Sequence, residues 1–192
     1  MRDNRLSISF LFHKGYPSLD WIQVEISSYC KALFVSRGDD SGTHTKEQAL
    51  WKQSGVPLQN RTTSIIKKGK KVDIGFLHPE GLGSWYLSIG QGMGKAITFA
   101  EEKQAYILAD RGTFIKYKHG RNAGLDLAVL CEEDSFLANP YGVIPINPEK
   151  FPHVKHDLAE EFAKWLVSPR GQAVIGNYRL LGKQLFYPDA IK

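Results

Sequence analysis

The turn at residues 37–43, Arg-Gly-Asp-Asp-Ser-Gly-Thr, combines residue types that suit the binding of an anion. It follows the apolar run 32–36 and precedes a stretch of good helix formers, so it lies where a strand leads into a helix. Free backbone N–H groups at a helix start carry partial positive charge, and glycines let the backbone approach a ligand closely. Ser41 and Thr43 add hydroxyl donors, and Arg37 offers a planar fork to a tetrahedral oxyanion. The pattern therefore indicates an oxyanion-binding turn.

The same turn also admits a purely structural interpretation. In that case the hydroxyl of Ser41 or Thr43 only caps the helix, because these residue types satisfy the first unpaired N–H groups. Arg37 would then form an ion pair with Asp39 or Asp40. The spacing alone leaves both interpretations open.

A second loop, at residues 110–113, repeats the order of strand, arginine, glycine and hydroxyl. Alone it is typical of a surface turn with an ion pair. Ligands of α/β proteins bind beyond the carboxyl ends of strands, so two arginine-bearing strand exits in one chain strengthen each other. We therefore expect Arg37 and Arg111 to contribute to one site.

Other candidate chemistry has less support in the sequence. His44 lies close to two carboxylates, but there is no nucleophile elbow, no His pair at metal spacing and no Cys/His arrangement. We interpret His44 as a solvated or capping side chain. The glycines of 90–94 superficially resemble a dinucleotide-binding loop, yet their spacing differs and the pattern shows no clear strand before them. The residues by themselves do not assemble an enzyme site.

The elements that position these loops alternate between strands and helices, which indicates an α/β architecture. We expect strands at 32–36, 105–109 and 125–130. Helices are expected at 45–54, after the glycines of 90–94 and from about residue 114. Residues 56–83 are expected to form a long connection, and residues 1–31 show no regular pattern.

The C-terminal part predicts one strand and two helices. Residues 141–146 read as a strand that Pro145 restricts to an edge or a crossing segment. The next helix carries Leu158, Phe162, Trp165 and Leu166 on one face. A second helix follows at once, with Ser168 as its N-cap and Pro169 at its first position.

Composition sets the broad class of the protein. The chain has 192 residues, 42% hydrophobic and 23% charged, which is ordinary for a globular protein with a real core. No apolar run approaches the ~20 residues that span a bilayer, and the first residues show no signal peptide. The net charge is +5. The densest cluster of positive charge consists of Lys67, Lys68, Lys70 and Lys71, and we interpret it as a solvated loop without nucleic-acid contact. Cys30 and Cys131 are expected to be buried thiols.

Several segments match, in order, the tungstate-binding periplasmic proteins of ABC transporters, a family with the type II solute-binding fold. The longest is Phe-Val-Ser-Arg-Gly-Asp-Asp-Ser-Gly-Thr-His at 34–44. The others are 84–86, 90–94, 105–113, 139–144 and 185–189. Their joint order and spacing are specific, so the chain resembles this family from about Phe34 to its end.

The resemblance implies an α/β fold of the type II periplasmic-binding-protein kind, with two lobes that close over an oxyanion. Residues 33–138 would form the second lobe, which carries the anion loops, and residues 139–192 would be the crossover strand and C-terminal helices of the first lobe. Residues 1–32 stay poorly assigned. The family begins with a first-lobe strand and a Thr/Ser-rich loop that we do not recognise before Ala32. We therefore expect an incomplete first lobe and a homodimer formed through it.

The resemblance also implies which residues hold the oxyanion. The ligands would come from both loops: Ser36, Arg37, Ser41, Gly42, Thr43 and Arg111. Asp39, Asp40 and Thr113 would support them from behind. No metal cation and no cofactor are expected, since tungstate or molybdate would be bound as the oxyanion. Both are fully deprotonated near neutral pH and need only donors, whereas phosphate keeps a proton and profits from a carboxylate acceptor.

The function implied by the resemblance is non-enzymatic. The chain would capture tungstate, or molybdate, as the solute-binding component of an ABC uptake system, with the permease as partner and a periplasmic or extracellular location. Three alternatives stay open. In the first, a protein of the same fold would bind phosphate or sulfate. In the second, a truncated lobe would have lost ligand binding and would act only as an interaction module. In the third, an enzyme acting on phosphate esters would use His44 or Asp40 as acid or base.

Overall fold

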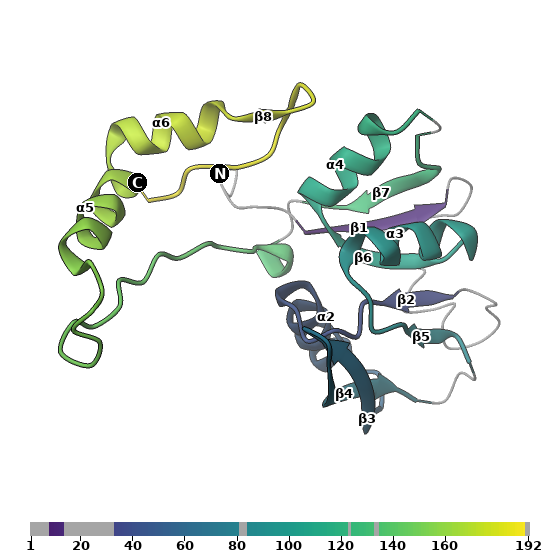
Figure 1. Ribbon diagram of the computed structural model, residues 1–192. Coiled ribbons are helices and arrows are strands. Elements are labelled where there is room, and N and C mark those ends of the chain that lie inside the picture. Colours follow the sequence, from purple (N-terminus) through teal and green to yellow (C-terminus); the bar gives the residue numbers. More distant parts are fainter. Residues whose placement is uncertain (1–7, 14–32, 81–83, 123, 133–134, 191–192) are drawn as a thin grey trace. The chain divides into compact units, whose positions relative to one another are not determined.

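The computed structural model describes residues 8–13, 33–80, 84–122, 124–132 and 135–190 (Figure 1). These residues divide into two compact units, of which the first ends at Leu137 and the second begins at Ala138. None of the helices in the described ranges is long and apolar enough to cross a membrane.

The first unit is built on a five-stranded sheet in the order β5-β2-β6-β1-β7 (Figure 1). In chain order the strands are β1 Ile8–His13, β2 Phe34–Ser36, β5 Tyr86–Ser88, β6 Tyr106–Asp110 and β7 Leu127–Cys131. Strand β2 pairs in parallel with β5 on one side and with β6 on the other. Strand β1 is antiparallel to β6 and to β7, so β7 points in the same direction as β6.

The strands predicted at 32–36, 105–109 and 125–130 are confirmed as β2, β6 and β7. The sequence pattern assigned no element to β1 or to β5. Strand β5 has only three residues, so its extended form depends on pairing with β2, and such a non-local contact leaves no periodic signal.

Three helices cover the two faces of this sheet: α2 Gly42–Gln53, α3 Met93–Glu102 and α4 Arg111–Gly120. One core cluster joins α3 and α4 to one face, and Ile97, Phe114 and Ile107 belong to it. The other cluster joins α2 to the opposite face, where the Trp51 ring meets Phe34 edge-on at 5.2 Å between centroids. Successive strand residues point to opposite faces, and both faces are covered, which confirms the α/β architecture.

Replacement of Ile97 by alanine tests this core. Ile97 is fully buried on α3, so Ile97→Ala is expected to destabilise the protein by about 2–5 kcal/mol through lost contacts and a cavity. Ile66→Ala is the matched control, because 72% of Ile66 is exposed and its loss should cost less than about 0.5 kcal/mol. Urea unfolding followed by circular dichroism measures both, and equal effects would contradict the assigned core.

The prediction of a long connection over residues 56–83 is wrong. Strands β3 Leu58–Lys67 and β4 Lys70–Pro79 pair along their whole length as an antiparallel hairpin. Lys68 and Gly69, with φ of 52° and 76°, form its two-residue turn, which suits a tight hairpin. The segment from Thr62 to Ile66, in which four of five residues are β-branched, was the available strand signal. The clustered lysines thus lie at the exposed tip of a hairpin.

The second unit contains two helices and a small hairpin, and the short 3-10 helix η1 Ser135–Leu137 precedes it. The helices are α5 His156–Val167 and α6 Pro169–Asn177, and the hairpin strands are β8 Arg179–Leu180 and β9 Lys183–Gln184. The predicted helix start at Ser168 is confirmed, because its hydroxyl accepts the Gly171 N–H at 3.1 Å and Pro169 follows it.

Two expectations for the second unit are wrong or incomplete. Residues 141–146 form no strand, and in this unit their backbone pairs with no neighbouring strand. The apolar face of α5 is present but not buried, since Leu158 is 59% and Phe162 55% exposed. A strand at residues 141–146 would need a neighbouring strand, and the apolar face of α5 would need an apolar surface to cover it. The described residues of this unit supply neither.

Candidate functional site

The carboxyl ends of three parallel strands meet at one edge of the sheet, and each strand leads to the start of a helix. Strand β2 leads to α2, β5 to α3 and β6 to α4. The chain passes from β2 to β5 on one side and then to β6 on the other, so the order of connection reverses between β2 and β6. Ligands of open α/β sheets bind at such a switch point. Arg37 and Arg111 directly follow these two strands.

The loop at residues 37–41, called here the Arg37 loop, is held against the start of α3. Gly38 has φ +57°, and a side-chain Cβ built on it would lie 2.1 Å from the Ser88 Oγ. The Gln91 N–H donates to the Arg37 carbonyl at 3.0 Å, and the Gly38 N–H donates to the buried Ser36 Oγ at 3.2 Å. Only glycine at position 38 allows this approach.

Asp39 organises the Arg37 loop from behind. One carboxylate oxygen of Asp39 lies 2.5 Å from Arg37 Nη2, and the other accepts the Ser41 N–H at 3.3 Å. Ser41 is the N-cap of α2, since its hydroxyl oxygen accepts the His44 N–H at 3.3 Å. The structural interpretation of the turn is therefore correct as far as it goes. It does not account for every donor of the Arg37 guanidinium, because the buried Nε has no hydrogen-bond partner in the described part of the chain.

Of the two expectations for His44, the solvated side chain is wrong, because only 4% of this residue is exposed, whereas its ring does accept a backbone N–H at the start of α2. Its Nδ1 accepts the Asp40 N–H at 3.1 Å, so in the neutral ring the proton sits on Nε2. Burial lowers the pKa of His44, although the carboxylates of Asp39 and Asp40 oppose this shift. His44 therefore acts as a neutral acceptor that supports Asp40, which has φ +55°.

Arg111 occupies the first position of α4, which begins three residues before the predicted start at 114. Asp110 is the N-cap, and its carboxylate accepts both the N–H and the hydroxyl of Thr113 at 2.8 Å. The Arg111 guanidinium pairs with the carboxylate of Glu132, which follows β7. Thr113 thus supports the helix start, and Glu132 orients Arg111.

The glycine-rich segment before α3 also lies at this edge, which sequence reasoning missed. We expected no strand before Gly90, but β5 ends at Ser88. Gly92, the N-cap of α3, makes no side-chain capping bond, so the first N–H groups of α3 have no side-chain acceptor there. The same order of strand end and helix start is therefore repeated three times along one edge.

The sequence-predicted site residues are brought together at this edge. Those from the first loop lie between the end of β2 and the first turn of α2: Ser36, Arg37, Asp39, Asp40, Ser41, Gly42 and Thr43. Those from the second loop, Arg111 and Thr113, lie in the first turn of α4. In the described ranges no group of three His, Cys, Asp or Glu side chains is placed to hold a metal ion.

A buried carboxyl group, Glu47, lies one turn further along α2. Its Oε1 accepts the Tyr86 hydroxyl at 2.6 Å and the Trp51 indole N–H at 3.2 Å. Burial raises the pKa of Glu47 to about 7, and hydrogen bonds from Tyr86, Ser36 and Trp51 oppose the shift. Ser36 thus links this acid to the Arg37 loop.

The pH dependence of stability follows from Glu47. Its pKa is raised in the fold from 4.5 to about 7, so folding favours the protonated acid. This contribution is fully present below pH 4.5 and is lost as the pH rises through 7, up to on the order of 3 kcal/mol. We expect the stability difference between the native protein and Glu47→Gln to shrink over this range. Chemical denaturation across pH measures it, with the exposed Glu102→Gln as control; a flat difference for Glu47→Gln would contradict the assignment.

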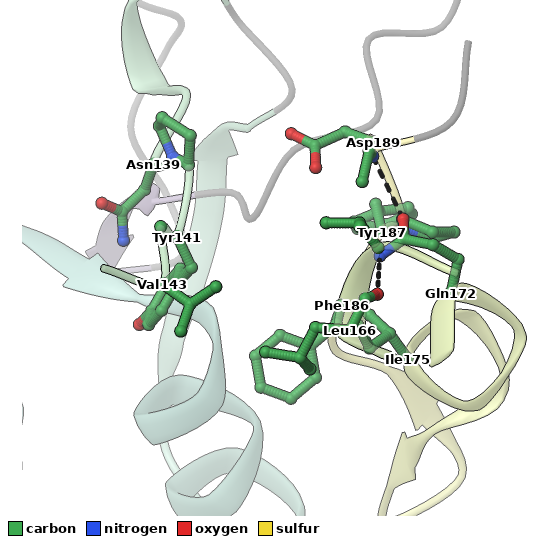
Figure 2. A pocket seen from close by; sticks show the side chains of 14 residues that line it. Asn139, Tyr141, Val143, Leu166, Gln172, Ile175, Phe186, Tyr187 and Asp189 are labelled. Carbon is green, nitrogen blue, oxygen red and sulfur yellow. Dashed lines mark hydrogen bonds between the residues drawn. The ribbon is translucent and has the colours of Figure 1, made fainter. Parts of the chain in front are cut away.

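The second unit contains a separate cavity of about 520 Å³ between residues 139–143 and 186–190 (Figure 2). Its wall is largely apolar and includes Leu166, Ile175 and Phe186. The amide of Gln172 is already engaged, since it accepts the Ala190 N–H at 3.1 Å and donates to the Leu166 carbonyl at 2.8 Å. This cavity therefore lacks the convergent donors that an oxyanion requires.

Comparison with known proteins identifies the family. A model of the PBP superfamily domain matches residues 20–170. The tungstate-binding protein TupA of Peptoclostridium acidaminophilum is 40% identical over 164 residues, which are 84% of this chain and 48% of that protein. TupA of Campylobacter jejuni is 38% identical over 189 residues, which are 98% of this chain and 60% of that protein. The chain thus spans about half the length of the curated relatives it matches.

A solved structure agrees with these matches. The tungstate-binding protein TupA from Desulfovibrio alaskensis superposes with a TM-score of 0.73 and 35% identity, over 97% of this chain and 68% of that one. The type II periplasmic-binding-protein fold implied by the resemblance is thereby confirmed. The chain belongs to the PBP superfamily and, within it, to the family of the TupA proteins.

Proposed function

We propose that this chain binds a tetrahedral oxyanion, tungstate, as part of the solute-binding component of an ABC uptake system. The observation that carries the proposal is the single sheet edge where Arg37, Arg111 and the starts of α2, α3 and α4 follow three adjacent parallel strands. Charge-assisted hydrogen bonds from arginine and backbone N–H groups at helix starts are the donors that such an anion needs. The relatives named TupA are tungstate-binding proteins, which supports the same ligand here.

The ligands would be the residues that the resemblance gives: Ser36, Arg37, Ser41, Gly42, Thr43 and Arg111. Asp39, Asp40 and Thr113 would support them, in keeping with the bonds that Asp39 and Thr113 make. Both carboxylates of the Arg37 loop are paired with cations, Asp39 with Arg37 and Asp40 with Lys67. A loop whose two carboxylates are both paired favours fully deprotonated anions, tungstate and molybdate, over phosphate.

The geometry favours binding over catalysis. His44, the candidate acid or base of an enzyme, is buried and its Nδ1 is used by the Asp40 N–H. The names of two relatives, an ABC transporter anion-binding protein and a tungstate ABC transporter, support a membrane permease as the proposed partner and a periplasmic or extracellular location, with no cofactor.

Calorimetric titration with tungstate, molybdate, sulfate and phosphate tests this function. We expect heat with tungstate and with molybdate, and much weaker heat with phosphate. Absence of heat with all four anions would overturn the proposal and leave a lobe that acts only as an interaction module. Preference for phosphate or sulfate would replace tungstate as the ligand.

Arg37 is the residue on which binding should depend most. Arg37→Ala is expected to abolish tungstate binding, because it removes the charged donor that Asp39 orients at the end of β2. Its midpoint of thermal unfolding is expected to change little. Arg61→Ala is the matched control, since Arg61 is exposed on β3 and, among the described residues, its guanidinium donates a hydrogen bond only to the Gln59 side chain. Calorimetric titration of both variants with tungstate measures the effect. Normal binding by Arg37→Ala would contradict the claim that Arg37 holds the oxyanion.

We also propose that the chain forms a homodimer through the apolar face of α5. Leu158, Phe162 and Trp165 are all exposed there, and the rings of Phe162 and Trp165 stack with centroids 6.0 Å apart. Contiguous apolar surface of this kind is unfavourable in water and is relieved by a second copy of the same face.

Phe162→Glu is expected to shift the protein to a monomer, because a charge in the shared face cannot be buried without a partner. Sedimentation velocity over a range of protein concentrations measures the shift. Val174→Glu is the control, since Val174 is equally exposed, 55%, but lies on α6. A native protein that stays monomeric throughout would contradict the homodimer.

A further inference from the structure

We propose that Lys67 is a positioning residue that makes the Arg37 loop acceptable to a dianion, because its ammonium group neutralises Asp40. The inference rests on the proposed function and adds to it a residue from the β3–β4 hairpin. The Lys67 Nζ lies 3.1 Å from Asp40 Oδ2 and joins segments 27 residues apart in the sequence.

The charges of the Arg37 loop do not favour an anion by themselves. The loop contains one arginine and two carboxylates, Asp39 and Asp40. Arg37 is paired with Asp39. Asp40 would therefore leave the loop with a net negative charge and repel a dianion. Lys67 supplies the missing positive charge.

The conformation of the loop limits which residues suit position 40, and aspartate is one of them. Asp40 adopts φ +55°, a left-handed conformation that favours glycine, asparagine and aspartate. Its N–H is held by His44 Nδ1, so this conformation is part of the turn. An acidic side chain at this position therefore requires a compensating cation.

The hairpin is fixed in a position from which Lys67 can reach the loop. Ile65, buried on β3, packs against Gly90, where an added Cβ would lie 3.0 Å from Ile65 Cγ2. A cavity of about 530 Å³ lies between the hairpin and the loop edge, and its lining includes Asp39, Lys67, Lys68 and Gly92. Lys67 is thus placed beside the Arg37 loop by packing as well as by charge.

A double-mutant cycle on tungstate binding tests this role. Lys67→Gln is expected to weaken binding about three- to tenfold at low ionic strength, since it exposes the dianion to the charge of Asp40. Asp40→Asn removes that charge, keeps the side-chain shape and the backbone N–H that His44 accepts, and suits the left-handed conformation. The double variant Lys67→Gln/Asp40→Asn is therefore expected to bind within about twofold of the native protein. At high salt the effect of Lys67→Gln should fall below about twofold, because both groups are half exposed.

Lys71→Gln is the matched control. Lys71 is also exposed on this hairpin, but it pairs with Ile66 and so projects from the opposite face of the ribbon to Lys67. The Lys71→Gln substitution removes the same charge as Lys67→Gln and is expected to leave tungstate binding unchanged. Equal losses in Lys67→Gln and Lys71→Gln, or no recovery in the double variant, would overturn the inference. If the native protein itself binds no tungstate, that result contradicts the proposed function and, with it, this inference. If the native protein binds tungstate and only the Lys67 variants behave otherwise, the result contradicts this inference alone.

Discussion

The close approach of Gly38 to Ser88 is the constraint on which the rest of the site edge depends. Any side chain at position 38 would meet the Ser88 hydroxyl oxygen, at 2.1 Å for Cβ. Because the two loops lie this close, the Gln91 N–H reaches the Arg37 carbonyl, and the starts of α2 and α3 are held beside each other. Short parallel strands give direction to the helices, and the backbone hydrogen bond from Gln91 to Arg37 ties the two loops together at their starts.

Charge around that edge is arranged in pairs that link distant parts of the first unit. Arg37 pairs with Asp39 within one loop, whereas Lys67 and Glu132 reach their partners Asp40 and Arg111 from the hairpin and from the end of β7. Below the loop, Glu47 is held by Tyr86 and Trp51 and favours its neutral form. The protein thus compensates the negative charges of the loop while retaining the carboxyl groups that orient it.

The sequence predicted those features whose cause is local. Ser168 and Pro169 start α6 because a hydroxyl N-cap and a fixed φ act within one turn. The Arg37 loop was recognised for the same reason. Strand β5 and the β3–β4 hairpin were not, because the extended form of β5 depends on β2 and the hairpin register depends on a Lys68–Gly69 turn that lacks the usual asparagine or aspartate. The partners of Arg111 and Asp40 lie 21 and 27 residues away, and spacing carries no information about such contacts.

The tryptophans of the described residues divide between the two units and differ in their exposure to solvent. Trp51 and Trp85 are buried in the first unit, whereas Trp165 is 39% exposed on α5. The indole N–H of Trp51 donates to Glu47, so its emission is coupled to the ionisation of that acid. A water-soluble quencher reaches Trp165 far more readily than the two buried indoles. Among these described indoles, quenching therefore separates the emission of the exposed helix face from that of the buried core of the first unit.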